Sequence, residues 1–412
     1  MRLDLPRHLP LPWLLFALLA GCAPEAAPGE PAAWHPLEVP AVAGSTGAHL
    51  AAGDGTLVLS WVEPHAGGHA LRYARLGASG WSEPRTAASG TDWFVNWADF
   101  PSVVPLSAEL WAAHWLVRHP AGGYAYDVLV SLSADRGASW SAPVRPHDDG
   151  TATEHGFVSL FPRPQGAGVL WLDGRNLAQP AAAEAGVPRG TTLRTATVTP
   201  RGALVEAREI DSLTCDCCRT DVARAGDATV AVYRGRTADE IRDIFAVRLA
   251  GDGWERPRPV ADDGWQVDGC PVNGPAIASD GDRLAAAWFT GADGAPRVRL
   301  ARSDDAGRTW SAPVDVASGS VRGHAGIEFL PGARVAVSWI CEREAGASVC
   351  LGTVSPDGTA GPVQVVSGEA KVPPLSVPQL ARDGDRLVVA WTEESAGTTR
   401  LASAAIDVAA LP

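Results

Sequence analysis

The chain has 412 residues, 46% of them hydrophobic, and a formal net charge of −13 with one lysine, Lys371. An acidic, lysine-poor surface argues against nucleic acid as a partner, because phosphate contacts need clustered positive charge. The length allows one large or two medium domains, and after residue 20 no apolar run is long enough to cross a bilayer.

The first 33 residues have the pattern of an export signal and a tether. Arg2 and Arg7 precede an apolar run, and the sequence Leu19-Ala20-Gly21-Cys22 resembles the bacterial lipobox. The resemblance implies a signal peptide over residues 1–21 and a lipid on Cys22. We therefore expect attachment to the membrane through this lipid, at the outer membrane or the periplasmic face of the cell envelope. A plain secretory signal with an incidental cysteine is the alternative. Residues 22–33 are predicted to be a flexible tether.

The rest of the chain, residues 34–412, repeats itself. Apolar runs that carry one aromatic residue recur at steps of 51 to 62 residues, and the aromatic positions are Trp61, Trp115, Trp171, Tyr233, Trp288, Trp339 and Trp391. Each unit holds about four short β-rich runs separated by Gly, Asp and Pro turns. Four-stranded units repeated in this way predict a β-propeller. We expect an all-β fold with seven four-stranded blades, or six as the alternative. The segment 35–44 is predicted to complete the last blade and close the ring.

Two segments carry a family resemblance. The sequences "SADRGASW" (133–140) and "SDDAGRTW" (303–310) share the pattern S-x-D-x-G-x-x-W. This pattern resembles the Asp-box, or BNR repeat, of sialidase-like propellers, and the chain also resembles exported bacterial proteins of the exo-alpha-sialidase type. In such a turn, Asp135 and Asp305 would accept backbone N–H groups, and the glycine would adopt positive φ. The family places these turns away from the active face, so they indicate the fold rather than a reaction.

Propeller topology places the cysteines of the body on one face. Cys215, Cys217 and Cys218 precede the inner strand of the fourth blade, and Cys270 precedes that of the fifth. In an oxidising compartment, disulfides Cys218–Cys270 and Cys341–Cys350 are the first expectation. The alternatives for the cluster of Cys215, Cys217, Cys218 and Cys270 are a copper or zinc site built from thiolates and a redox-active pair.

The same face gathers the candidate residues for binding or catalysis. A sialidase-type hydrolase needs arginines for the substrate carboxylate, an acid and a tyrosine nucleophile. The candidates for substrate binding are Arg175, Arg219, Arg234, His155 and Asn273, and those for acid or base catalysis are Asp99, Glu154 and Asp221. The N-terminal Arg-Ile-Pro motif of sialidases is missing, and only four tyrosines occur.

Three functions are compatible with these patterns. The first is a non-catalytic, monomeric propeller that binds a glycan or protein ligand at the mouth of its channel. The second is a glycoside hydrolase of sialidase type, and the third is a metal or redox protein centred on the cysteine cluster. The missing arginine motif favours binding over hydrolysis.

Overall fold

The computed structural model describes residues 34–178, 189–251, 253–344, 346–368, 371–395 and 397–412. These residues form one compact unit, Trp34–Pro412. The predicted signal peptide, Cys22 and the tether lie outside them. Within the described residues no helix is long and apolar enough to cross a membrane.

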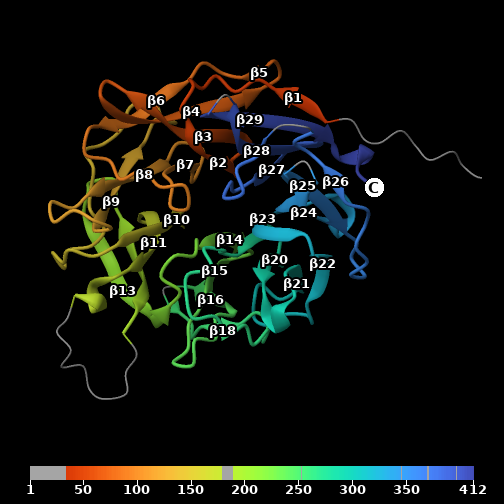
Figure 1. Ribbon diagram of the computed structural model, residues 1–412. Helices are drawn as coiled ribbons and strands as arrows, with labels where there is room; N and C mark the ends of the chain where they lie inside the picture. The colour runs from red at the N-terminus through yellow and green to blue at the C-terminus, as the bar shows by residue number, and fades with distance from the viewer. Residues whose placement is uncertain (1–33, 179–188, 252, 345, 369–370, 396) are drawn as a thin grey trace, which may run out of the picture. The chain divides into compact units, whose positions relative to one another are not determined.

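The unit is a seven-bladed β-propeller, as the repeat predicted, and the six-bladed alternative is wrong. Seven antiparallel sheets follow one another around a central axis (Figure 1). The first three sheets consist of β2 (Thr46–Gly53), β3 (Thr56–His65), β4 (Gly68–Gly77), β5 (Gly80–Trp81) and β6 (Arg85–Gly90); of β7 (Ser102–Pro105), β8 (Trp111–Arg118) and β9 (Tyr126–Ser133); and of β10 (His155–Arg163), β11 (Gly166–Asp173), β12 (Thr191–Val198) and β13 (Leu204–Thr214). In the second sheet, a single bridge between Val130 and Val144 stands where the fourth strand would run.

The next three sheets repeat this order. They consist of β14 (Asp221–Ala225), β15 (Ala228–Arg234), β16 (Ile244–Ala250), β17 (Gly253–Trp254) and β18 (Arg258–Pro259); of β19 (Ala276–Asp280), β20 (Arg283–Thr290), β21 (Arg297–Ser303) and β22 (Val314–Ser318); and of β23 (Val321–Phe329), β24 (Val335–Arg343), β25 (Gly346–Val354) and β26 (Gln364–Val365). The described helices are all 3-10 turns, at Arg175–Leu177, Ala292–Gly294, Pro331–Ala333 and Val408–Ala410.

The seventh sheet joins the two ends of the described chain. It has the order β1-β29-β28-β27, with β27 (Gln379–Asp383), β28 (Arg386–Ser395), β29 (Thr398–Asp407) and β1 (His35–Leu37). In the register of the β1–β29 pair, His35 lies opposite Ala405 and Leu37 opposite Ser403. The N-terminal strand therefore covers the outer edge of β29, which would otherwise expose unpaired backbone groups.

The repeated aromatic residues form the core between the blades. Each of the seven lies in the second strand of its sheet, and none is more than 7% exposed. The turns at 133–140 and 303–310 follow the third strands of their sheets. In them Asp135 accepts the backbone N–H of Ser139 and Asp305 accepts that of Thr309, while Gly137 and Gly307 have φ of 78° and 80°. In both turns the aspartate and the glycine therefore have the contact and the backbone angle that the sequence predicted.

Candidate functional site

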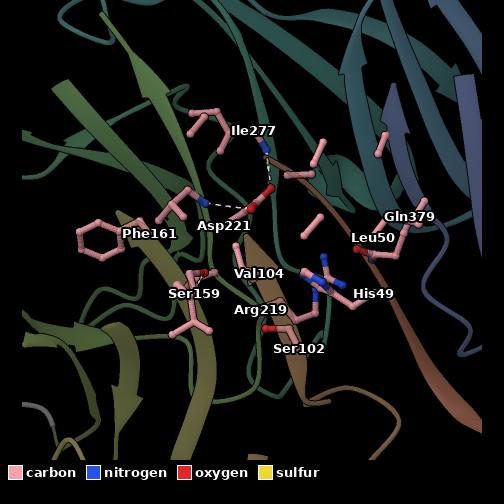
Figure 2. Close-up of a pocket in the computed structure, with 18 of the residues that line it drawn as sticks. His49, Leu50, Ser102, Val104, Ser159, Phe161, Arg219, Asp221, Ile277 and Gln379 are labelled. Carbon is pink, nitrogen blue, oxygen red and sulfur yellow. Dashed lines mark hydrogen bonds between the residues drawn. The ribbon is translucent and has the colours of Figure 1, made fainter. Parts of the chain in front are cut away.

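The first strands of the seven sheets enclose a central channel of about 500 Å³. Its lining includes residues of β2, β7, β10, β14, β19, β23 and β27 (Figure 2). Much of the wall is made of small or aliphatic side chains, such as Ala276 and Ala278 on β19. Short side chains on the inner strands leave space at the axis, and a cavity of this size suits a small organic ligand.

Three inner strands are irregular where they enter the channel. The pairing register shifts between Thr46 and His49 in β2, between Gly156 and Ser159 in β10, and between Gly323 and Gly326 in β23. Within these bulges Phe157 and His324 have positive φ, at 54° and 56°, which is uncommon for residues other than glycine. Bulges of this kind redirect side chains, and here they occur next to the polar residues of the channel.

Besides Arg224, whose Nε donates to the carbonyl of Gly226, this channel is lined by Arg219, which was predicted from the sequence as a binding residue. Arg219 lies two residues before β14, and its guanidinium carbon is 5.2 Å from the centre of the Phe100 ring. Within the described part of the chain, its guanidinium has no hydrogen-bond or ion-pair partner. Burial lowers the pKa of Arg219, and the nearby charges of Asp221 and Asp99 oppose that effect. The N–H donors of Arg219 are therefore free to bind an anion.

Neutral histidines surround Arg219. Burial and the charge of Arg219 lower the pKa of His49 to about 3, and burial and Arg219 also lower that of His324 to about 4. Burial lowers the pKa of His114 to about 3, and its Nδ1 lies 2.9 Å from Ser102 Oγ. The buried Nδ1 of His49 and Nε2 of His114 have no hydrogen-bond partner among the described residues. Unpaired buried polar atoms are costly, so these two nitrogens suit a polar ligand in the channel.

A second group of polar residues joins the channel to its rim. Asp99 lines the cavity and accepts a hydrogen bond of 2.8 Å from the Tyr126 hydroxyl. Burial raises the pKa of Asp99 to about 6, although the hydrogen bonds from Phe157 and Tyr126 act to lower it. Burial, with the like charges of Asp99 and Asp216, raises the pKa of Glu154 to about 7. A Cβ at Gly156 would lie 1.9 Å from Asp99 Oδ2, so only glycine fits there.

Three other predicted residues serve the framework. Arg234 is 1% exposed, and each of its three guanidinium nitrogens donates to a backbone carbonyl, those of Asn273, Arg242 and Phe289. Asn273 is also buried and accepts the backbone N–H of His324. Asp221 accepts the N–H group of Val222 and that of Ile277, the second of which can be followed in Figure 2. The geometry therefore favours a structural role for these residues. It does not favour the expected roles of Arg234 and Asn273 in substrate binding or of Asp221 in catalysis.

Arg175 belongs to a pattern that several blades repeat. Trp171 Nε1 donates to Asp173, which accepts two hydrogen bonds of 2.7 Å from Arg175. The same sequence of tryptophan, carboxylate and arginine occurs in Trp61–Glu63–Arg72, Trp391–Glu393–Arg400 and Trp288–Asp263–Arg299. A contact that recurs around the ring is structural. Of the three arginines predicted to bind substrate, Arg175, Arg219 and Arg234, it is Arg219 that lines the channel.

His155 lies in a buried cluster that the sequence analysis did not identify. Its ring stacks on His147 with centroids 3.8 Å apart, and Asp127, Asp149 and Asp173 surround the pair. This geometry meets the spacing for a metal ion. However, Val128 N–H donates to His147 Nε2, and Arg175 and Arg145 pair with the carboxylates. The arginines already supply positive charge here, so the cluster is explained as a link between the second and third blades.

The cysteines form the other group with metal-ligand spacing. Sγ of Cys215 lies 2.9 Å from that of Cys218 and 4.0 Å from that of Cys217, and the three are unbridged. Cys218 and Cys270 are both free, so the predicted disulfide Cys218–Cys270 is not formed in the structure. Cys215 and Cys218 stand in C-x-x-C spacing, a signal that the predicted pairing overlooked. The expected disulfide Cys341–Cys350 is present.

Solved structures with this fold include carbohydrate-active propellers. An ulvan lyase of polysaccharide lyase family PL25, bound to -[GlcA(1-4)Rha3S]-, aligns with a TM-score of 0.54 and 10% identity over 90% of this chain and 93% of that chain. A Dyadobacter fermentans protein of unknown function aligns with a TM-score of 0.48 and 13% identity over 91% and 95%. The NanB sialidase of Streptococcus pneumoniae has a TM-score of 0.48 and 8% identity over 87% and 84%. No family model and no curated protein matches the chain. At these identities the likeness concerns the fold alone.

Proposed function

We propose that this propeller binds an anionic saccharide in its central channel, with Arg219 as the partner of the negative group. The observation that carries this proposal is the guanidinium of Arg219, which lines the cavity and has no partner within the described residues. Arginine binds planar carboxylates and sulfates through paired N–H donors. An unpaired guanidinium beside a cavity of about 500 Å³ therefore favours a small ligand that carries such a group.

The neighbouring residues suit the uncharged part of a sugar. His49 and His114 present unpaired ring nitrogens, and Phe100 supplies an apolar ring next to the cation. Sugar hydroxyl groups both donate and accept hydrogen bonds, so they match neutral imidazole nitrogens of either tautomer. Asp99, whose pKa is raised to about 6 by burial, gains a proton in mildly acidic solution and then donates as well.

Glycoside hydrolysis of sialidase type is the second candidate. The contact that favours it is the hydrogen bond from the Tyr126 hydroxyl to Asp99, which joins a tyrosine to a carboxylate near the channel. Tyr126 is only 2% exposed and stacks on Phe94 at 4.2 Å, so its oxygen has little access to a sugar. A single free arginine also falls short of the group that a sialidase needs. We therefore expect no turnover of sialosides, and Arg219-dependent hydrolysis of one would reverse this ranking.

The test is direct binding of saccharides to the full chain. Oligosaccharides that contain glucuronate, galacturonate, sialic acid or sulfated rhamnose are compared with neutral ones of the same length by isothermal titration calorimetry. The glucuronate and sulfated rhamnose probes are included because the ulvan lyase is bound to a saccharide of that composition. The proposal predicts that at least one acidic probe binds and that its neutral counterpart binds more weakly. Equal affinity for both would contradict it.

The location of the protein is a separate proposal. The lipobox-like sequence that ends at Cys22 supports a lipid anchor in the cell envelope, and this segment lies outside the described residues. Replacing Cys22 with Ser is expected to move the protein from the membrane fraction to the aqueous fraction. Unchanged fractionation would contradict the anchor.

A further inference from the structure

The loop 215–218, which enters the fourth blade, brings three sulfur atoms together beside the channel. Cys215 and Cys218 are at most 1% exposed, and Cys217 is half-buried. The Sγ atoms of all three lie within 4.8 Å of one another. Cys217 also borders a small hollow that it shares with Trp97, Arg219 and His324. From this convergence we propose that Cys215, Cys217 and Cys218 bind a thiophilic d¹⁰ metal ion, Cu(I) or Zn²⁺, with Cys270 as a further ligand.

The spacing of the sulfurs fits coordination better than a single disulfide. A disulfide joins two sulfurs and leaves the third aside, whereas here Cys215 is close to both Cys217 and Cys218. Ligands at metal–sulfur distances of about 2.3 Å lie about 3.8 Å apart in a tetrahedral site. The 4.0 Å between Cys215 and Cys217 is close to this value, while the 2.9 Å between Cys215 and Cys218 has to widen by about 1 Å on binding.

A cation is placed to stabilise thiolate sulfur. Nη1 of Arg242 lies 3.3 Å from Cys215 Sγ and donates to it, and Nη2 of the same residue pairs with Glu240 at 2.7 Å. A guanidinium N–H directed at sulfur suits a thiolate, which is the form that binds metals. The hydrogen bond from Arg242 to Cys215 is thus of the kind that commonly orients a metal ligand from outside the coordination shell.

The backbone of the loop holds the sulfurs in place. Cys215 N–H donates to the carbonyl of Arg234, and Asp216 accepts from Thr191 N–H and from Arg236. With Asp216 fixed by these contacts, its two cysteine neighbours along the loop are held beside Cys218. Cys270 is exposed and is not among the three sulfurs that lie within 4.8 Å of one another, so it has to move closer to become the fourth ligand.

The choice between the two ions follows from the number of ligands. Three thiolates suit three-coordinate Cu(I), whereas zinc in a structural site takes four ligands, so it requires Cys270 as well. Replacing Cys270 with Ser therefore separates the two. Copper binding that survives this change identifies a three-sulfur site, and zinc binding that is lost with it identifies a four-sulfur site.

The test uses the full chain, reduced and then freed of reductant without air. It is titrated with Cu(I) against a chromophoric Cu(I) chelator, and separately with Zn²⁺ against a chromophoric zinc chelator. We expect one ion per chain and loss of tight binding in the Cys217→Ser variant. The double variant Cys341→Ser/Cys350→Ser is the matched control and is expected to bind as the wild type does. Arg242→Met is expected to weaken binding by about 10–100-fold.

A comparison of the wild-type protein with the Cys217→Ser variant is sufficient to overturn the proposal. If it binds neither ion more tightly than the Cys217→Ser variant does, the site does not exist. Peptide mapping of the unreduced protein after incubation with each ion gives an independent answer. Bonds Cys215–Cys218 and Cys217–Cys270 that persist in the presence of metal would show that the sulfurs serve as two disulfides.

Discussion

The guanidinium carbon of Arg219 lies 5.2 Å from the centre of the Phe100 ring. This contact positions the charge over an aromatic ring without using any of its N–H donors. The two carboxylates whose charges act on Arg219 accept hydrogen bonds from other groups. Asp99 accepts one from the Tyr126 hydroxyl, and Asp221 accepts two from backbone N–H groups. Arg219 thus lies in the channel with guanidinium N–H donors that no described residue accepts.

Replacing Phe100 with Leu is expected to weaken the binding of an acidic saccharide. The change removes the cation–π contact, which is worth about 1 kcal/mol, or roughly a five-fold loss of affinity. Isothermal titration of the variant measures it. Phe329→Leu changes a phenylalanine buried in the core of the fifth and sixth blades and is the control for a general loss of packing. An equal loss in both variants would show that Phe100 acts only on stability.

Glu154 makes stability depend on pH. An ordinary glutamate titrates near pH 4.3, whereas burial and like charges raise the pKa of Glu154 to about 7. The folded chain therefore holds this proton more tightly than the unfolded chain does, and Glu154 lowers the free energy of unfolding as the pH rises from about 4 to about 7. Glu154→Gln is expected to stabilise the protein by about 1 kcal/mol at pH 8 and to have little effect at pH 4. Urea unfolding at both pH values checks this, and a gain of the same size at both would refute it.

The disulfide Cys341–Cys350 links β24 to β25. It closes a short loop, with a sequence separation of 9 and Cα atoms 5.8 Å apart. The chain-entropy model gives a bond over such a loop about 2–3 kcal/mol of stability. The double variant Cys341→Ser/Cys350→Ser is expected to lose that amount in denaturant unfolding. Adding reductant should then destabilise the wild type and leave the variant unchanged, and a variant as stable as the wild type would contradict this.

The strand β1 is expected to be essential for the closed ring. Its residues pair with β29, the carbonyl of Leu37 accepts from Ser403, and Leu37, Val39 and Ala41 pack on the core of the first and seventh blades. Deleting residues 34–44 removes these contacts and exposes the edge of β29, so the free energy of unfolding should fall by about 3 kcal/mol or more. Size-exclusion chromatography should also show association through the open edge. A monomer of wild-type stability would show that closure lies elsewhere.

The sequence predicts the fold more completely than the site. Trp61 and its counterparts occupy the same core position in each blade, so counting these aromatic residues in the sequence gives the number of blades. Arg219, Arg234 and Arg175 are equivalent in such a reading, because all three lie in loops on one face. What separates them is where their hydrogen bonds go, and partners such as the carbonyls of Asn273 and Phe289 are distant in sequence.

Some functional groups were missed for the same reason. Tyr126 was not among the predicted site residues, yet it begins β9 and its hydroxyl donates to Asp99. His49 lies within β2 and His114 within β8, and a histidine inside an apolar strand has no distinguishing sequence pattern. The C-x-x-C spacing of Cys215 and Cys218 was the one signal present in the sequence itself that could have found the close pair.

The most direct test of anion binding compares one ligand with and without its charge. The affinity of the full chain for an acidic oligosaccharide and for its methyl ester is measured by isothermal titration, in the wild type and in Arg219→Met. Arg201→Met, at an exposed turn, serves as the control. The account predicts that the wild type and Arg201→Met prefer the charged form by roughly ten-fold or more, as expected for a charge-assisted contact of about 1.5–3 kcal/mol, and that Arg219→Met shows no preference. An undiminished preference in Arg219→Met would contradict the account.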